Sequence, residues 1–260
     1  MTTTAYLELP EAVTGDNYYA HTLKIGGKRN YSYLYDKTMY AALWVAYPLT
    51  SAHISGSAKS SWGYNPLIPS DYQVNVVNRS YPGSYGADDY ARGHQIPNAD
   101  RKSSGDMNAQ TYYVTNQTPQ LQDKFNGSIW SSLENSVRSL TSSTDTVYVV
   151  TGACFQTVGG NETINYLHSS TVTPENLPIP NYYWKVLLKV RRWTDGTITE
   201  ASSIGVWLEH KEYTDSNWGA HVTSVADIET KTGFNFFPWL SEEIQATTEN
   251  NSNWNRFSSF

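Results

Sequence analysis

The stretch TYYVTNQTPQLQDKFNGSIWSSLENSV, from Thr111 to Val137, contains the clearest helix signal of the 260-residue chain. Its apolar residues recur every four positions, at Phe125, Ile129, Leu133 and Val137. This spacing gives a single apolar stripe, which is typical of an amphipathic helix packed on a core. Before Thr118-Pro119, the β-branched and aromatic residues of TYYVTN predict a short strand over 111–116. The stretch therefore predicts a strand followed by a helix.

Strands are predicted on both sides of this helix. The apolar run MYAALWVAYPL over 39–49 indicates a buried strand, and similar β-branched or aromatic runs occupy 146–152, 182–190 and 203–208. Residues 55–89 are dense in Gly, Pro, Ser, Asn and Tyr, which predicts a long loop.

The end of the chain is predicted to carry little regular structure. A short helix is expected over 227–232, ended by Gly233, and residues 248–260 are expected to be frayed or loosely docked. No internal repeat or linker is evident. We therefore predict one α+β domain over 1–260, with a central, mostly antiparallel sheet and flanking helices.

Composition excludes several classes of protein. The hydrophobic fraction of 39% and charged fraction of 16% indicate a folded chain. A net charge of −6 argues against a protein that coats nucleic acid, although a small basic cleft can lie on an acidic body. Because Cys154 is the only cysteine, it excludes an intrachain disulfide and a cysteine metal cluster, and we expect it to be buried and inert.

Sequence motifs also bear on location and cofactors. No run is long and apolar enough to span a bilayer, and no glycine-rich nucleotide-binding loop occurs, so no nucleotide cofactor is expected. The segment TTTAYLELPEA after Met1 is interpreted as a start just beyond a removed leader. Together with many Tyr, Asn, Ser and Thr residues, it favours a secreted, periplasmic or cell-surface bacterial protein.

The first chemically informative group is Tyr90-Ala91-Arg92-Gly93-His94. If this segment is extended, Tyr90, Arg92 and His94 share one face, and Gly93 permits close approach of another segment. A guanidinium and an imidazole on one face suit phosphodiester hydrolysis, because one stabilises phosphate charge and the other takes a proton from water. Taken alone, Arg-Gly-His is more often a surface turn.

The second informative group lies on the predicted helix. Asn126, Trp130 and Glu134 form a row one position away from the apolar stripe, at the edge of the buried face. An amide oxygen and a carboxylate are hard oxygen donors suited to Mg²⁺. The alternative is that Glu134 is an ordinary solvated carboxylate and Asn126 an ordinary polar residue.

Together these motifs resemble the DNA/RNA non-specific endonucleases, whose ββα-metal finger carries a D-R-G-H motif. That motif stands here as Ala91-Arg92-Gly93-His94. The next signatures of the family are matched by Asn116-Gln117-Thr118-Pro119-Gln120 and by the helical row Asn126, Trp130 and Glu134. The likeness covers roughly residues 40 to 240, so both termini are expected to be peripheral to it.

The resemblance implies a role for each matched residue. His94 is expected to be the general base, and Arg92 to bind phosphate or stabilise charge in the transition state. Asn126 is expected to bind Mg²⁺ directly, with Mn²⁺ as a substitute, while Glu134 holds water molecules of the ion from the second shell. Asn116 is expected to fix the finger. The implied substrates are DNA and RNA, cut by hydrolysis to leave 5′-phosphate ends.

Two departures from the family pattern stand out. Ala91 replaces the aspartate of the motif. Because position 91 faces away from Arg92 and His94, that aspartate is expected to be a supporting group, and its loss to reduce or retune the activity rather than abolish it. The family also has an arginine upstream, near a tryptophan. Around Trp62 the nearest candidates for that cation are Lys59 and, from the long loop, Arg79. Each is also compatible with a plain surface cation.

Two alternatives remain at this stage. The first is a weakened relic of the same fold that binds nucleic acid without cutting it, motivated by Ala91 and the missing arginine. The second is a carbohydrate-binding protein or glycosidase, motivated by the 9 Trp and 20 Tyr residues. A glycosidase needs paired carboxylates across an aromatic cleft, and no such pair is identifiable in the sequence.

Overall fold

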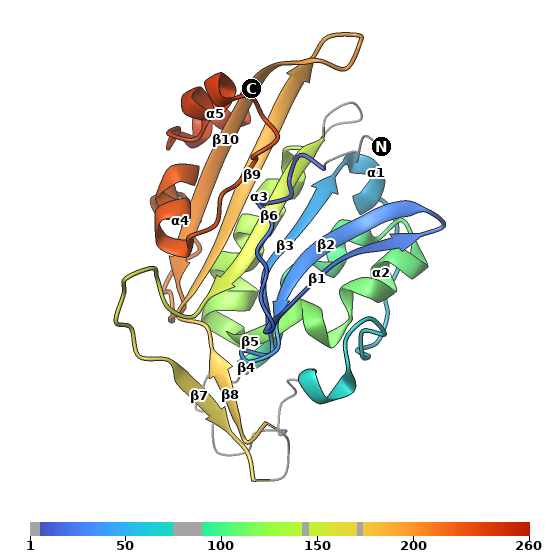
Figure 1. Ribbon diagram of the computed structural model, residues 1–260, viewed down its shortest axis with the longest axis vertical. Helices are drawn as coiled ribbons and strands as arrows, with labels where there is room; N and C mark the ends of the chain where they lie inside the picture. The colour runs from blue at the N-terminus through green and yellow to red at the C-terminus, as the bar shows by residue number, and fades with distance from the viewer. Residues whose placement is uncertain (1–5, 75–89, 142–145, 171–173) are drawn as a thin grey trace.

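A seven-stranded antiparallel sheet forms the centre of the computed structural model, which describes residues 6–74, 90–141, 146–170 and 174–260. The strand order is β1-β2-β3-β6-β9-β10-β11 (Figure 1). These strands are β1 Tyr18–Ile25, β2 Lys28–Asp36, β3 Ala41–Leu49, β6 Val147–Cys154, β9 Tyr182–Arg192, β10 Ile198–Glu209 and β11 Val222–Thr223. Two separate hairpins pair β4 Tyr90–His94 with β5 Gln117–Leu121, and β7 Asn165–His168 with β8 Asn176–Ile179.

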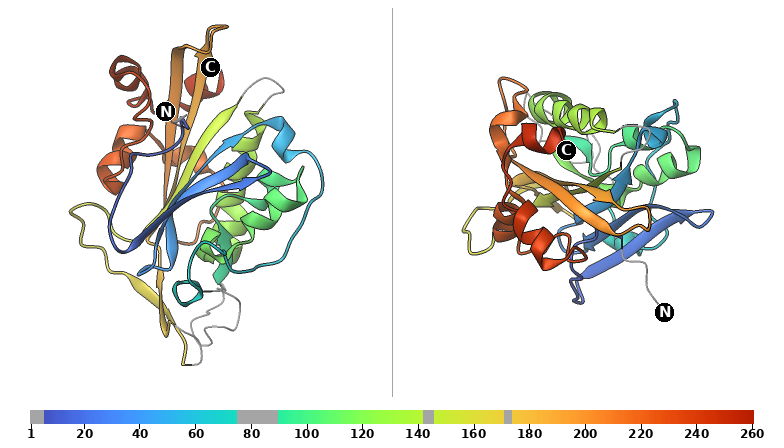
Figure 2. Two further views of the ribbon diagram at one scale, coloured as in Figure 1. Left: turned by 45° about the vertical axis from the view of Figure 1, so that its right-hand side comes forward. Right: turned by 90° about the horizontal axis from the view of Figure 1, so that it is seen from above.

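Helices cover both faces of the sheet (Figure 2). The α-helices are α1 Ser51–Ile54, α2 Gly105–Thr111, α3 Ser131–Ser139, α4 Val225–Thr232, α5 Glu242–Thr248 and α6 Trp254–Ser258. A π-helix, η4, spans Gln122–Trp130 and runs directly into α3. The short 3₁₀ turns are η1 Ser70–Tyr72, η2 Asn98–Arg101, η3 Val114–Asn116 and η5 Trp218–His221. Among the described residues, no helix has the length and apolar character that a membrane crossing requires.

Alternation along β9 divides the core into two layers. Tyr183 and Leu187 point to the face covered by η4 and α3, whereas Trp184 and Val186 point to the face covered by α4. All of these side chains are fully buried. The α+β class and the mostly antiparallel sheet predicted from the sequence are therefore confirmed.

The predicted helix stripe is confirmed, but its first half has a different geometry. Phe125, Ile129, Leu133 and Val137 are all buried against the sheet. Residues 122–130 are wound as a π-helix, in which the Ser131 N–H reaches back to the carbonyl of Asn126. Trp130, expected at the edge of the buried face, is only 1% exposed and lies in the core. Such π-helical turns are rare and occur frequently at functional sites.

Several predictions at segment ends were wrong. Residues 111–116 form the end of α2 and the turn η3, and the strand follows later as β5. The last residues were expected to be frayed or loosely docked, but they form α6, and Phe257 is fully buried against the sheet. The helix expected at 227–232 begins two residues earlier, at Val225, and ends at Gly233 in a left-handed conformation with φ 74°.

The hairpin of β4 and β5 shows why a glycine is needed at position 93 and which side chain lacks a partner next to Ala91. Ala91 pairs directly with Gln120, and Gly93 pairs with Thr118. The Gln120 side chain lies across Gly93, where a Cβ would overlap it. Gln120 is fully buried, yet within the described parts of the chain neither its Oε1 nor its Nε2 has a hydrogen-bond partner. An unsatisfied buried amide costs about 1–3 kcal/mol, so the alanine leaves a defect on this face of the hairpin.

Restoring a carboxylate at position 91 should repair this defect. Residues paired across an antiparallel ladder have side chains on the same face, so an Ala91→Asp side chain can accept a hydrogen bond from Gln120 Nε2. We expect Ala91→Asp to raise the free energy of unfolding by about 1 kcal/mol, measured by urea denaturation.

A double-mutant cycle with Gln120→Ala isolates the contact. In the Gln120→Ala background the same aspartate should give no gain, because its partner is absent. Equal effects of Ala91→Asp in both backgrounds would show that Gln120 is not the partner.

Candidate functional site

His94 ends β4 in a wall of aromatic rings. Its imidazole centroid lies 4.6 Å from the Trp62 ring and 5.1 Å from the Tyr112 ring, and Trp62 and Tyr112 are themselves 5.2 Å apart. The His94 Nε2 atom is buried and has no hydrogen-bond partner among the residues that the structure describes. This atom is therefore free to accept a proton from a molecule bound beside it.

Positive charges surround this imidazole. The Arg92 guanidinium lies 5.2 Å from the Trp62 ring centroid, so Arg92 and His94 share one face of β4, as predicted from the alternation. Burial, together with the charges of Arg92 and Lys102, lowers the pKa of His94 to about 3. Lys102 in turn has Lys59 as a neighbouring charge, which together with burial lowers the Lys102 pKa. His94 is therefore neutral at physiological pH within a cationic surrounding.

Asn116 fastens the segment that follows His94. Its carbonyl oxygen accepts from Gln95 N, its Oδ1 accepts from Ile96 N, and its Nδ2 donates to the carbonyls of Ile96 and Thr111. The four distances lie between 2.8 and 3.0 Å, and Asn116 is only 1% exposed. Asn116 thus fixes the backbone that presents His94.

The helical half of the site begins directly after the hairpin. β5 leads into η4, and both hairpin strands pack against it, so His94 and Asn126 belong to one hairpin–helix unit. Asn126 is half-buried, and its Nδ2 donates to Gln122 Oε1 at 3.1 Å. That bond fixes the amide and leaves its oxygen available as an acceptor.

Glu134 lies in a buried group of charges next to the sheet. Its carboxylate is 14% exposed and lies 4.0 Å from the Arg138 guanidinium, which also donates to Asp100 at 2.8 Å. Burial raises the pKa of Glu134 to about 7; Lys185 and Arg138 oppose the shift, and Asp100 adds to it. Lys185 is 1% exposed, with its Nζ 4.4 Å from the Trp130 ring centroid and 3.1 Å from Thr151 Oγ1.

The structure brings some of the predicted residues together and separates others. Arg92 and His94 share the Trp62 ring, while Asn116 supports them from behind. Lys59 is exposed beside Lys102, and Arg79 lies outside the described residues. Sequence reasoning missed Lys102, since no motif marks it and the turn η2 is what returns it toward His94.

The oxygen donors of the helix fit a weakly held divalent cation. Among the described residues there is no group of three or more His, Cys, Asp or Glu side chains able to enclose a metal ion. The candidates are instead the amide oxygen of Asn126, which accepts no hydrogen bond from the described residues, and the Glu134 carboxylate, whose pKa is raised mainly by burial. This donor set suits Mg²⁺, which retains most of its water.

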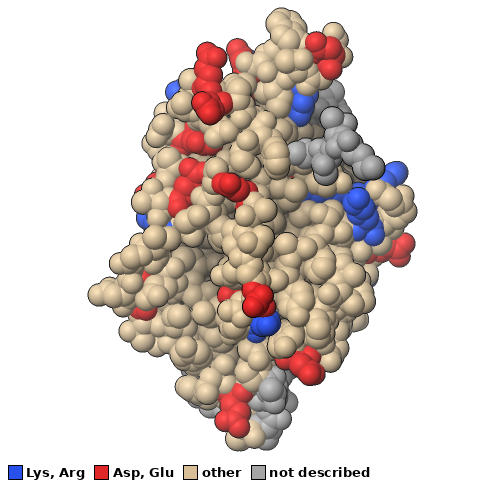
Figure 3. Space-filling view, in the orientation of Figure 1, with Lys and Arg blue, Asp and Glu red and all other residues tan. Residues whose placement is uncertain are grey.

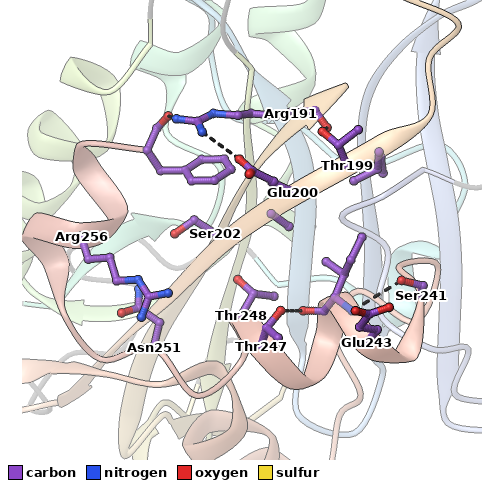
Figure 4. A pocket seen from close by; sticks show the side chains of 14 residues that line it. Arg191, Thr199, Glu200, Ser202, Ser241, Glu243, Thr247, Thr248, Asn251 and Arg256 are labelled. Atoms are coloured by element: carbon purple, nitrogen blue, oxygen red, sulfur yellow. Dashed lines mark hydrogen bonds and ion pairs between the residues drawn. The ribbon is translucent and has the colours of Figure 1, made fainter. Parts of the chain in front are cut away.

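A separate cavity of 600 Å³, which His94 does not line, lies between the start of β10 and α5 (Figure 4). Its walls include Arg191 and Glu200, which form an ion pair of 2.7 Å, and Arg256, which approaches Asn251. No histidine or cysteine lines it. The arrangement offers no activated base, so the hairpin–helix unit remains the candidate site.

Comparison with known proteins agrees with this assignment. The family model described as DNA/RNA non-specific endonuclease matches residues 15–243. A nuclease from Nostoc sp. is 29% identical over 245 residues, covering 92% of this chain and 80% of that protein. Nuclease EXOG, mitochondrial, from Danio rerio is 27% identical over 224 residues, covering 82% of this chain and 61% of that protein.

A solved structure shares the fold. The crystal structure of the EndoG/EndoGI complex contains a chain that matches with a TM-score of 0.69 and 20% identity, covering 88% of this chain and 91% of that one. The family model spans most of the present sequence, including the hairpin and the helix. The chain therefore belongs to the DNA/RNA non-specific endonuclease family.

Proposed function

We propose that this protein is a metal-dependent endonuclease that hydrolyses DNA and RNA to leave 5′-phosphate ends, with His94 as the general base. The observation that carries the proposal is the setting of His94, whose Nε2 atom has no hydrogen-bond partner among the described residues and whose ring shares the Trp62 side chain with the Arg92 guanidinium. A neutral imidazole among cations can take a proton from water at a site that attracts phosphate.

The chain's own residues account for the main steps. His94 Nε2 takes a proton from water, and the water oxygen forms a bond to phosphorus as the bond to the 3′-oxygen breaks. The departing 3′-oxygen takes a proton from solvent. Arg92 stabilises the added negative charge on the phosphate oxygens, and Lys102 supplies a second positive charge. Asn116 keeps the His94 backbone in place.

Asn126 would hold Mg²⁺ directly, and Glu134 would hold it through water. When bound, the ion would neutralise charge on the phosphate and the leaving oxygen. The support for this part is the amide oxygen of Asn126 and the buried Glu134 carboxylate on the same helical unit. A neutral ligand and few protein donors predict weak binding in the absence of substrate.

Replacement of His94 by alanine should abolish cleavage without loss of fold. We expect nicking of supercoiled plasmid in Mg²⁺ to fall about 10²- to 10⁴-fold, since general-base catalysis supplies that factor. His168→Ala is the matched control, because His168 is exposed on β7, and it should cleave normally. Wild-type protein that binds plasmid but never nicks it would identify a non-catalytic relic instead.

Removal of the Asn126 amide should abolish most of the metal-dependent activity, because the proposed direct ligand of the ion is lost. Activity should vanish in EDTA and return with Mg²⁺ or Mn²⁺, while Asn126→Ala should lose most activity at every concentration of the ion. Asn126→Asp should tighten Mg²⁺ binding, measured by calorimetry, because it adds a negative charge. Asn250→Ala, in the exposed turn that follows α5, serves as the control. Full wild-type activity in EDTA would place the chemistry elsewhere.

The acid limit of activity should reflect Glu134 and not His94. Glu134 has a raised pKa of about 7, so the carboxylate is lost as the pH falls through that value, whereas His94 stays neutral far below it. At limiting Mg²⁺, kcat/KM should fall below about pH 7, and more Mg²⁺ should move this limit to lower pH, because cation and proton compete.

Glu134→Gln should flatten that acid limb and lower activity about 10- to 100-fold. Lys102→Gln should leave the limb in place. A limb that persists in Glu134→Gln and shifts in Lys102→Gln would assign it to His94.

A further inference from the structure

Tyr64 is an exposed aromatic residue on a firmly anchored segment. Gly63 pairs with the chain around Tyr113 through two backbone hydrogen bonds, from Gly63 N to Tyr112 O at 3.1 Å and from Val114 N to Gly63 O at 2.9 Å. Asn65, on the other side of Tyr64, is 1% exposed. Its Nδ2 donates to Tyr33 OH and Thr115 Oγ1, at 2.8 and 3.0 Å.

Between these anchors, the Tyr64 side chain is 59% exposed. Leaving a large aromatic ring in water on an ordered backbone gains nothing for the fold, since burial is what makes such rings stabilising. The ring therefore adds little to the packing of the core and is open to contact with a ligand.

Tyr64 belongs to the segment that carries Trp62, the ring in contact with His94. The two residues flank Gly63, which forms the β-bridge to Tyr113, and in extended backbone of this kind alternate side chains leave the same side. Trp62 is already occupied, because its ring contacts His94, Tyr112 and the Arg92 guanidinium. Tyr64 is the adjacent open ring, within about 7 Å along the backbone.

The small number of cations near His94 makes an uncharged contact, such as one with the Tyr64 ring, important for binding. On the face shown in Figure 3, acidic and basic side chains form small separate groups on a mostly uncharged surface. The cations placed beside His94 in the described part of the chain are Arg92, Lys102 and, next to the latter, Lys59. So few phosphate contacts leave room for base stacking, which contributes about 1–3 kcal/mol per base.

We propose that Tyr64 stacks on a nucleobase next to the scissile phosphate, and that it thereby selects nucleic acid whose bases are unpaired at that point. A base held in a duplex is covered by its neighbours and cannot offer its face to the ring without unstacking. Single-stranded segments therefore gain a contact that duplex lacks. The inference rests on the proposed nuclease function of the His94 site.

The test compares wild-type, Tyr64→Ala, Tyr64→Phe and Trp193→Ala on a single-stranded oligonucleotide and on a hairpin duplex of the same sequence. Trp193 is the matched control, because it is 67% exposed at the end of β9 (Figure 1), away from the β4–β5 hairpin. Tyr64→Ala should lower kcat/KM on the single strand about 5- to 150-fold and on the duplex less than about threefold. Tyr64→Phe, which keeps the ring, should restore single-strand cleavage.

A binding experiment separates this inference from the proposed function. In the His94→Ala background, fluorescence anisotropy measures affinity for the labelled single strand without cleavage, and Tyr64→Ala should weaken it by a similar factor. Equal losses on both substrates, no loss, or a matching loss in Trp193→Ala would overturn the stacking role. Failure of wild-type to cleave either substrate would overturn the nuclease proposal, while the anisotropy result would still decide whether Tyr64 binds bases.

Discussion

The ion pair between Asp100 and Arg138 joins the two halves of the site. Asp100 lies in η2, shortly after His94, and Arg138 lies in α3, one turn beyond Glu134. Asp100 also accepts from Tyr47 OH at 2.8 Å, which ties both to the sheet. The side chains of Asp100 and Arg138 are only 2% and 16% exposed, and removing two charges from water is costly. The pair is therefore stable only because both groups also form hydrogen bonds. Loss of either partner would leave a buried charge and weaken the link between η2 and α3.

The main elements of the fold were predictable because their signals are local. The stripe at Phe125, Ile129, Leu133 and Val137 specifies its own buried face, whatever the winding of the first half. The β1–β2 hairpin was missed, since its lysines and tyrosines lack a clean apolar alternation. The docking of α6 was missed because Phe257 supplies one apolar anchor, and only the tertiary structure reveals the groove that receives it.

The residues of the candidate site that lie close together in the sequence could be predicted, whereas those brought near by the tertiary structure could not. Alternation alone placed Arg92 and His94 on one face. Lys102 could not be found in this way, because its proximity to His94 depends on the turn η2. The surroundings of Glu134 were equally hidden, since Lys185 comes from β9, about fifty residues later, and reaches the carboxylate only through the packed core.

The net negative charge of the protein does not prevent a phosphate group from lying beside His94, because electrostatic repulsion from distant acidic residues is screened by salt. Screening at physiological ionic strength acts over about 8 Å, so acidic groups such as Glu200 and Glu243 near the C-terminal helices hardly affect a phosphate at His94. The local cations then set the affinity, and they are few in the described part of the chain. A site with few phosphate contacts holds its product weakly, which favours turnover. It must obtain any further discrimination from contacts that do not depend on charge, and next to His94 those contacts are aromatic.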